Sequence, residues 1–109
     1  MRTNNRIIAI ELTSLDSTSL TVNYQAINPD GLEEACYLLR IINASGMDVT
    51  LSGDGVTDND FVMAGDTAMV TAPYSSADMP NFKEGSIIYV KSTGAGQSGA
   101  VYLAGYART

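Results

Sequence analysis

Residues 35–52 read Ala-Cys-Tyr-Leu-Leu-Arg-Ile-Ile-Asn-Ala-Ser-Gly-Met-Asp-Val-Thr-Leu-Ser. The first half, residues 35–43, is almost continuously apolar, which is typical of a strand buried on both faces. A helix is the competing interpretation, but the turn-forming residues 43–46 would end it early. The second half alternates, so we expect Met47, Val49 and Leu51 to point inward and the residues between them outward. The stretch therefore predicts two consecutive β-strands joined by a turn.

The same two-residue period recurs on both sides of this stretch, between clusters of turn-forming residues. The expected strands cover residues 6–14, 19–27, 35–43, 47–52, 61–63, 66–72, 86–92 and 99–106. The first two are expected to form an antiparallel hairpin, and residues 73–84 a long loop. Seven or eight short strands predict an all-β fold, a single-domain antiparallel β-sandwich that resembles a jelly roll. It would span residues 1–109, with residues 1–5 as a flexible or partner-bound arm.

The composition excludes most enzyme mechanisms. The chain has no histidine, which removes Ser-His-Asp and Cys-His nucleophiles, and its one cysteine, Cys36, has no partner for an intrachain disulfide. Six basic and twelve acidic residues give a net charge of −6, whereas a protein that binds nucleic acid or anionic lipid needs a positively charged surface. We therefore expect no enzyme activity, no cofactor, no nucleic-acid partner and no membrane partner. The short apolar runs predict neither a signal peptide nor a membrane span, and hence a soluble chain made in a host cytoplasm.

Five of the twelve acidic residues lie between residues 48 and 66. Within this segment Asp54, Asp58 and Asp60 form a weak candidate site for Ca²⁺, which prefers six to eight oxygen ligands. The spacing does not match an EF-hand, so the favoured interpretation is a solvated loop whose Asp and Asn side chains set turns. The adjacent pair Glu33-Glu34 is not expected to act as a glycosidase pair, because neighbouring strand residues point to opposite faces.

Surface contacts remain as the expected mode of action. Tyr24 and three further tyrosines could stack on sugar rings, although tyrosine is more common at protein interfaces. The edges near the first and last strands, residues 7–12 and 101–106, are expected to pair with a partner chain, because an edge strand has free backbone amides. Cys36 is expected to be an inert buried thiol. The interface candidates are Ile7, Ile10, Tyr89, Val101, Tyr102 and Tyr106.

The chain resembles a group of small virion proteins of tailed bacteriophages over roughly residues 20–106. The resemblance lies in residues 39–45 (Leu-Arg-Ile-Ile-Asn-Ala-Ser), 48–62, 64–65, 85–91 (Gly-Ser-Ile-Ile-Tyr-Val-Lys) and 101–106 (Val-Tyr-Leu-Ala-Gly-Tyr). It implies an all-β structural component of the particle, with no catalytic residues.

Its partners would be the major capsid protein or neck and tail proteins, and it would form a homo-oligomer in the virion. The leading hypothesis is a capsid decoration or cement protein that stabilises the particle through contacts between subunits. The alternatives are a neck or tail component, and a small carbohydrate-binding module for host attachment that uses loop tyrosines and an Asp-bound Ca²⁺.

Overall fold

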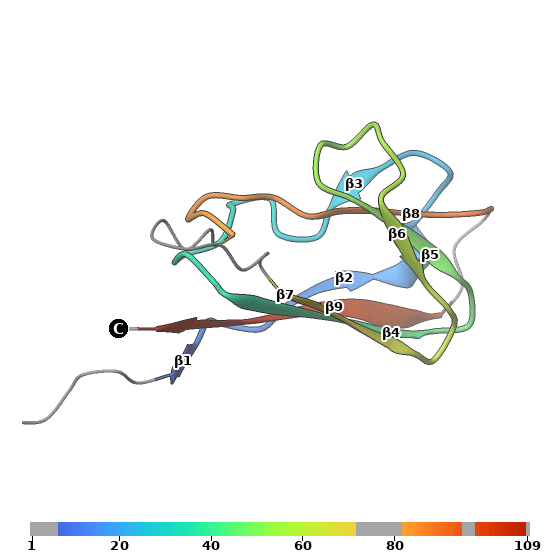
Figure 1. Ribbon diagram of the computed structural model, residues 1–109. Coiled ribbons are helices and arrows are strands. Elements are labelled where there is room, and N and C mark those ends of the chain that lie inside the picture. Colours follow the sequence, from blue (N-terminus) through green and yellow to red (C-terminus); the bar gives the residue numbers. More distant parts are fainter. Residues whose placement is uncertain (1–6, 72–81, 95–97, 109) are drawn as a thin grey trace, which may run out of the picture.

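The computed structural model describes residues 7–71, 82–94 and 98–108 (Figure 1). The predicted arm at residues 1–5 and most of the predicted loop at 73–84 lie outside these residues. The described chain folds into two antiparallel sheets that face each other. Its elements are β1 (Ile7–Ala9), β2 (Thr13–Asp16), the 3₁₀-helix η1 (Ser17–Ser19), β3 (Gln25–Ala26), β4 (Leu38–Ser45), β5 (Val49–Ser52), β6 (Asp60–Val62), β7 (Thr67–Thr71), β8 (Tyr89–Ser92) and β9 (Gly99–Arg108).

Sheet A has the strand order β1-β9-β4-β7, and sheet B has the order β3-β8-β5-β6. Strand β2 also pairs with β9, on the same side as β1, and the amide of Ile10 between them donates to the Gly105 carbonyl at 3.0 Å. Strands β1 and β2 therefore form one interrupted edge strand. With these two counted as one, the sheets have the orders 1-8-3-6 and 2-7-4-5, which is the strand order of a jelly roll. The predicted all-β sandwich is confirmed.

The predicted pairing of the first strands is wrong. Strands β1 and β2 pair with β9, and β3 pairs with β8. The turn between β2 and β3 is local, because the Asp16 carboxylate accepts a hydrogen bond from the Thr18 amide at 3.0 Å and starts η1. The chain then leaves sheet A for sheet B, and of the strand predicted at 19–27 only Gln25–Ala26 forms.

The prediction that residues 101–106 form a sheet edge is also wrong. Strand β9 lies inside sheet A, with β4 on one side and β1 and β2 on the other. Its backbone groups are already paired with those neighbours. The edges of sheet A are the interrupted strand β1–β2 and strand β7.

The core lies between the sheets and follows the expected alternation. Met47, Val49 and Leu51 point inward as predicted. One polar side chain, Asn43 on β4, is fully buried among them and donates to the carbonyls of Met47 at 2.8 Å and Val62 at 3.0 Å. This amide therefore ties sheet A to β6 of sheet B.

Candidate interaction surfaces

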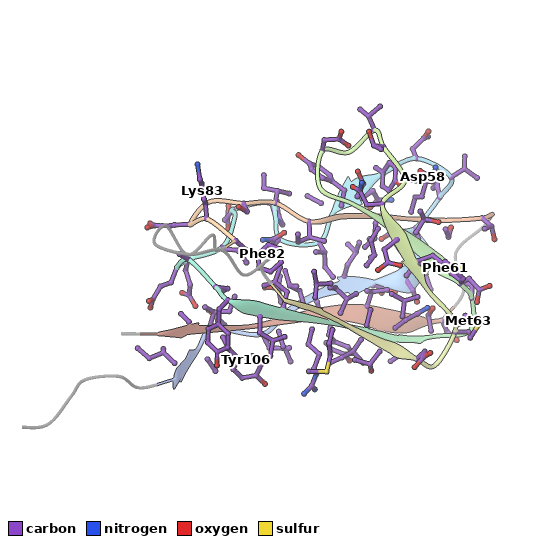
Figure 2. All side chains as sticks on the ribbon, viewed as in Figure 1. Asp58, Phe61, Met63, Phe82, Lys83 and Tyr106 are labelled. Carbon is purple, nitrogen blue, oxygen red and sulfur yellow. The ribbon has the colours of Figure 1, made fainter. Side chains whose placement is uncertain are left out.

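The outward side of sheet A carries apolar side chains on β4, β7 and β9. Along β4, Leu39 and Ile41 point into the core, so the residues between them point outward. The same alternation holds along β9, and Figure 2 shows Tyr106 on the side away from sheet B. We call this surface outer face A, made by Ser14, Asp16, Leu38, Arg40, Ile42, Ala44, Thr67, Met69, Ala100, Tyr102, Ala104 and Tyr106.

Outer face A presents two charged side chains among those the structure describes, Arg40 and Asp16. Arg40 stands in register with Met69 on β7 and Ala104 on β9, so neither strand neighbour offers it an acceptor. Its Nε atom is buried and has no hydrogen-bond partner within the described chain. Met69 beside it is 64% exposed. The buried Nε atom of a half-buried arginine in an apolar field thus has no acceptor from residues 7–71, 82–94 and 98–108.

Asp16 occupies another part of the same face, at the end of β2. Its Oδ1 atom accepts from the Thr18 amide at 3.0 Å and from the Thr18 hydroxyl at 2.8 Å. These hydrogen bonds lower the pKa of the Asp16 carboxyl, so it is ionised at neutral pH. The charge is held at the edge of outer face A by a fixed turn.

The outward side of sheet B is covered in part by its own chain. The loop of residues 53–59 folds over it (Figure 1). Asp54 orders this loop by accepting from the amides of Val56 at 2.9 Å and Thr57 at 2.8 Å, which holds its pKa well below the usual value. Gly55, with φ +80°, lies so close to the Tyr89 ring that an added Cβ would be 3.4 Å from it.

A polar cluster fastens the end of this loop to the sheet. The Tyr24 hydroxyl donates to Asp58 at 2.6 Å, and the Lys91 ammonium lies 3.1 Å from the same carboxylate oxygen. The ammonium also lies 4.7 Å from the centre of the Tyr24 ring. Burial and the hydrogen bond to Asp58 raise the pKa of Tyr24 to about 12, and the hydrogen bonds from Tyr24 and Lys91 lower the pKa of Asp58. These charges are satisfied within the chain.

The weak Ca²⁺ candidate is not assembled as a site. Asp54 binds its own loop, Asp58 binds Tyr24 and Lys91, and Asp60 accepts from the Phe61 amide at 2.8 Å. No three Asp, Glu or Cys side chains of the described chain come together where a metal ion could bind. The favoured interpretation, that acidic residues set turns in this loop, is confirmed for Asp54.

The interface candidates separate into distinct environments. Tyr102 and Tyr106 lie on outer face A, whereas Tyr89 lies beneath the loop on sheet B. Val101 is 0% exposed and Ile10 packs against the core, so Val101 is a core residue rather than a surface one. Ile7 is described only by its backbone pairing with Arg108.

Sequence reasoning missed the residues on β4 and β7 that complete outer face A. Leu38, Ile42 and Met69 are apolar and point outward, and Arg40 stands between them. The signal was present in residues 37–42, because apart from one arginine these residues would make both faces of a strand apolar. The run predicts a strand buried on both faces, whereas in the structure one face is buried and the other is half-buried.

A cleft of about 380 Å³ lies where β1 and β2 separate. It is lined by residues 10–14 and 28–33, and the Glu11 amide donates across it to Glu33 at 2.7 Å. Leu12, 56% exposed, stands at its rim. A second apolar group is exposed at the end of β6, where Phe61 lies on the strand and Met63 follows it (Figure 2).

The Cys36 thiol is fully buried, and burial together with the nearby Glu34 and Glu33 raises its pKa. A raised pKa keeps the thiol protonated and weakly nucleophilic. Among the described residues, no helix has the length and apolarity needed to cross a membrane.

No protein-family model and no curated protein matches the sequence. Among solved structures, a protein of Bacillus endospore appendages, which form disulfide-linked pili, matches with a TM-score of 0.52 at 15% identity over 99% of this chain and 95% of that chain. A Macrobrachium rosenbergii extra small virus particle protein gives 0.48 at 12% identity over 97% and 80%, and PirA gives 0.40 at 13% over 98% and 96%. The chain thus shares its all-β fold with a protein of the Bacillus appendages.

Proposed function

We propose that the protein is a non-enzymatic structural protein of a tailed-bacteriophage virion, and that it acts as a capsid decoration or cement protein. The observation that carries this proposal is outer face A. Apolar side chains on β4, β7 and β9 face outward there, around one arginine whose Nε has no acceptor among the described residues. Contiguous apolar surface of this kind marks sites of contact with other proteins.

Two further observations support a structural role. The groups best suited to chemistry are engaged in holding the fold, since Asp58 and Lys91 fasten the loop over sheet B and Cys36 is buried with a raised pKa. The same fold occurs in a protein of the Bacillus appendages, which form pili. With the resemblance to small virion proteins, these observations favour a subunit of an assembly over an enzyme.

A decoration protein needs a surface for the shell and another for its neighbours. We assign the shell contact to the edge formed by β1 and β2, which has β9 on one side and no paired strand on the other within the described chain. A strand of a shell protein can add to such an edge through backbone hydrogen bonds. Exposed Leu12 beside the cleft gives that contact a side-chain anchor.

The test is co-sedimentation of the purified protein with empty heads of a tailed bacteriophage. We expect binding that raises the temperature at which the heads break, and a loss of binding of about tenfold for Leu12→Lys, because a charge would be buried at the contact. Val22→Lys is the matched control, since Val22 is equally exposed but lies outside the edge strand.

Three results would contradict the proposal. Binding to isolated necks or tails in place of heads would make the protein a component of those structures. Glycan binding that EDTA abolishes would favour the carbohydrate-binding module. Equal binding of heads by the Leu12→Lys and Val22→Lys variants would mean that the edge formed by β1 and β2 is not the shell contact.

A further inference from the structure

Outer face A lacks a partner, and its charges indicate which molecule covers it. Resting on the proposed structural role, we infer that outer face A binds the same face of a second copy of this chain. In this contact Arg40 of each copy meets Asp16 of the other, and the two Tyr102 side chains meet near the two-fold axis.

The register of sheet A carries this geometry. Arg40 on β4 pairs with Ala104 of β9, and Asp16 on β2 pairs with Ala100. Strand β9 runs between β4 and β2, and Tyr102 lies midway between Ala104 and Ala100. Tyr102 is therefore the centre of the line that joins Arg40 to Asp16. A two-fold axis that lies in the plane of the contact, passes over Tyr102 and is perpendicular to this line places Arg40 of each copy over Asp16 of the other.

Charge balance favours a second copy over a different protein. The chain carries a net charge of −6, so most contacts between two copies would bring like charges together. Outer face A avoids this repulsion, because its two described charges are one cation and one anion. A surface that is complementary to itself is what an isologous two-fold contact requires.

The Asp16 carboxylate of a second copy can accept a hydrogen bond from Arg40. Nε of Arg40 is buried without a partner in the described chain, and a buried donor left in that state costs free energy. Both hydrogen bonds from Thr18 go to Oδ1 of Asp16, and they leave Oδ2 for a guanidinium. Association would thus satisfy an arginine that folding of one chain leaves unsatisfied.

The apolar part of the face supplies the contact area. Ile42, Tyr102 and Ala104 surround the line between the charges, and Leu38 and Met69 extend the surface. A stable interface buries about 800 Å² per partner. The accessible surface of the chain is 6424 Å², so such a contact would cover about an eighth of it.

The experiment is sedimentation velocity over a range of protein concentrations for wild type, Arg40→Glu, Asp16→Arg and the double variant. We expect a wild-type dimer, a dimer constant weakened about tenfold or more in each single variant, and recovery in the double variant, because reversing both charges restores the pairs. Lys83→Glu is the matched control, since it makes the same charge change at an exposed residue outside sheet A.

Asp16→Arg also removes the hydrogen bonds to Thr18, so circular dichroism must show that it folds. Ile42→Asp, which leaves that turn intact, provides an independent break and should be monomeric. A wild-type monomer at every concentration, or a double variant no stronger than the single ones, would overturn the inference.

Head binding distinguishes this inference from the proposed function. If wild type stays monomeric but binds heads, the inference fails and the decoration role stands. If wild type dimerises as described but ignores heads, the dimer stands and the decoration role fails.

Discussion

The two outer faces of the sandwich differ in what covers them. On sheet B the loop of residues 53–59 lies over the strands, and Asp58 is bound by Tyr24 and Lys91 from the sheet side. On sheet A the half-buried side chains of Leu38, Ile42 and Tyr102 point outward in adjacent strands, on the same side as Tyr106, which Figure 2 shows facing away from sheet B. The loop covers part of sheet B, although Phe61 on β6 is 57% exposed, and outer face A holds an arginine whose buried Nε has no partner in the described chain.

The charged groups on the two outer faces differ in whether they find partners within the described chain. On sheet B the charged groups are satisfied internally, and the pKa values of Asp54 and Asp58 are lowered by that bonding. On sheet A the charged Arg40 has a buried Nε with no partner in the described chain. An unsatisfied donor inside an apolar field therefore indicates an interface more specifically than apolar residues alone.

The largest expected effect comes from the residue that connects the two sheets. Asn43→Leu should lower the free energy of unfolding by about 3 kcal/mol, because the carbonyls of Met47 and Val62 lose their donor inside the core. Urea denaturation followed by circular dichroism measures this. Asn59→Ala, which removes an exposed acceptor for the Gly53 amide, should cost less than about 1 kcal/mol. Equal costs would mean that Asn43 does not hold the sheets together.

The next effect tests how the loop covers sheet B. Gly55→Ala should cost about 1 kcal/mol, because φ at Gly55 is +80° and an L side chain is strained there. Gly65→Ala is the control, since φ is +78° and its Cβ would meet nothing within 4 Å. We expect similar stability losses from urea denaturation, with a changed Tyr24 titration only in Gly55→Ala. A cost for Gly65→Ala alone would show that the loop does not hold its conformation.

A smaller effect appears at alkaline pH. The pKa of Tyr24 is raised to about 12 by burial and by Asp58, whereas an unfolded tyrosine titrates near 10. The stability that this tyrosine contributes is fully present below pH 10 and is lost as the pH rises from 10 towards 12. Tyrosinate absorbance should show one late-titrating group that Tyr24→Phe removes.

Asp58→Asn should move that late titration back towards pH 10, because it removes the neighbouring negative charge. Asp60→Asn should not, since the Asp60 carboxylate binds the Phe61 amide instead. Identical titrations in the two variants would mean that Asp58 does not raise the pKa of Tyr24.

The smallest expected effect on the folded monomer is at Met69 on outer face A. Met69→Ser should change the free energy of unfolding by less than about 0.5 kcal/mol, because the side chain is 64% exposed. It should nevertheless weaken self-association several-fold in sedimentation, because that side chain would be buried in the contact. Met63→Ser, at the corner after β6, should leave association unchanged. Weaker self-association in Met63→Ser than in Met69→Ser would mean that the interface lies at the corner after β6.

The sequence predicted the strands better than their pairing. Two-residue alternation identifies which side chains share a face, and it correctly placed Met47, Val49 and Leu51 in the core. It does not identify the neighbouring strand, because β1, β2 and β4 pair with β9 across most of the chain length. The turn at Asp16 was expected, but its effect of sending the chain to the other sheet depends on tertiary contacts.

The candidate surface was predicted only in part. Tyr102 was identified because aromatic residues are common at interfaces, and its alternation with Val101 already placed the two on opposite sides. Arg40 was missed because the apolar run around it fits a strand buried on both faces as well as a strand with one outward apolar face. Met69 was missed because its position beside Arg40 depends on the pairing of β7 with β4. The covering of sheet B by its own loop, which distinguishes the two faces, is a long-range contact that local pattern does not encode.

The most direct test of the central claim compares one aromatic residue on each outer face. Tyr102→Cys places a thiol at the proposed two-fold axis, Phe61→Cys places one on the outward side of β6, and the native Cys36 is buried. Under mild oxidation at micromolar protein concentration, non-reducing electrophoresis should show rapid formation of a disulfide-linked dimer in Tyr102→Cys and little in Phe61→Cys. Equal crosslinking of both variants, or faster crosslinking of Phe61→Cys, would contradict the pairing of outer face A with its own copy.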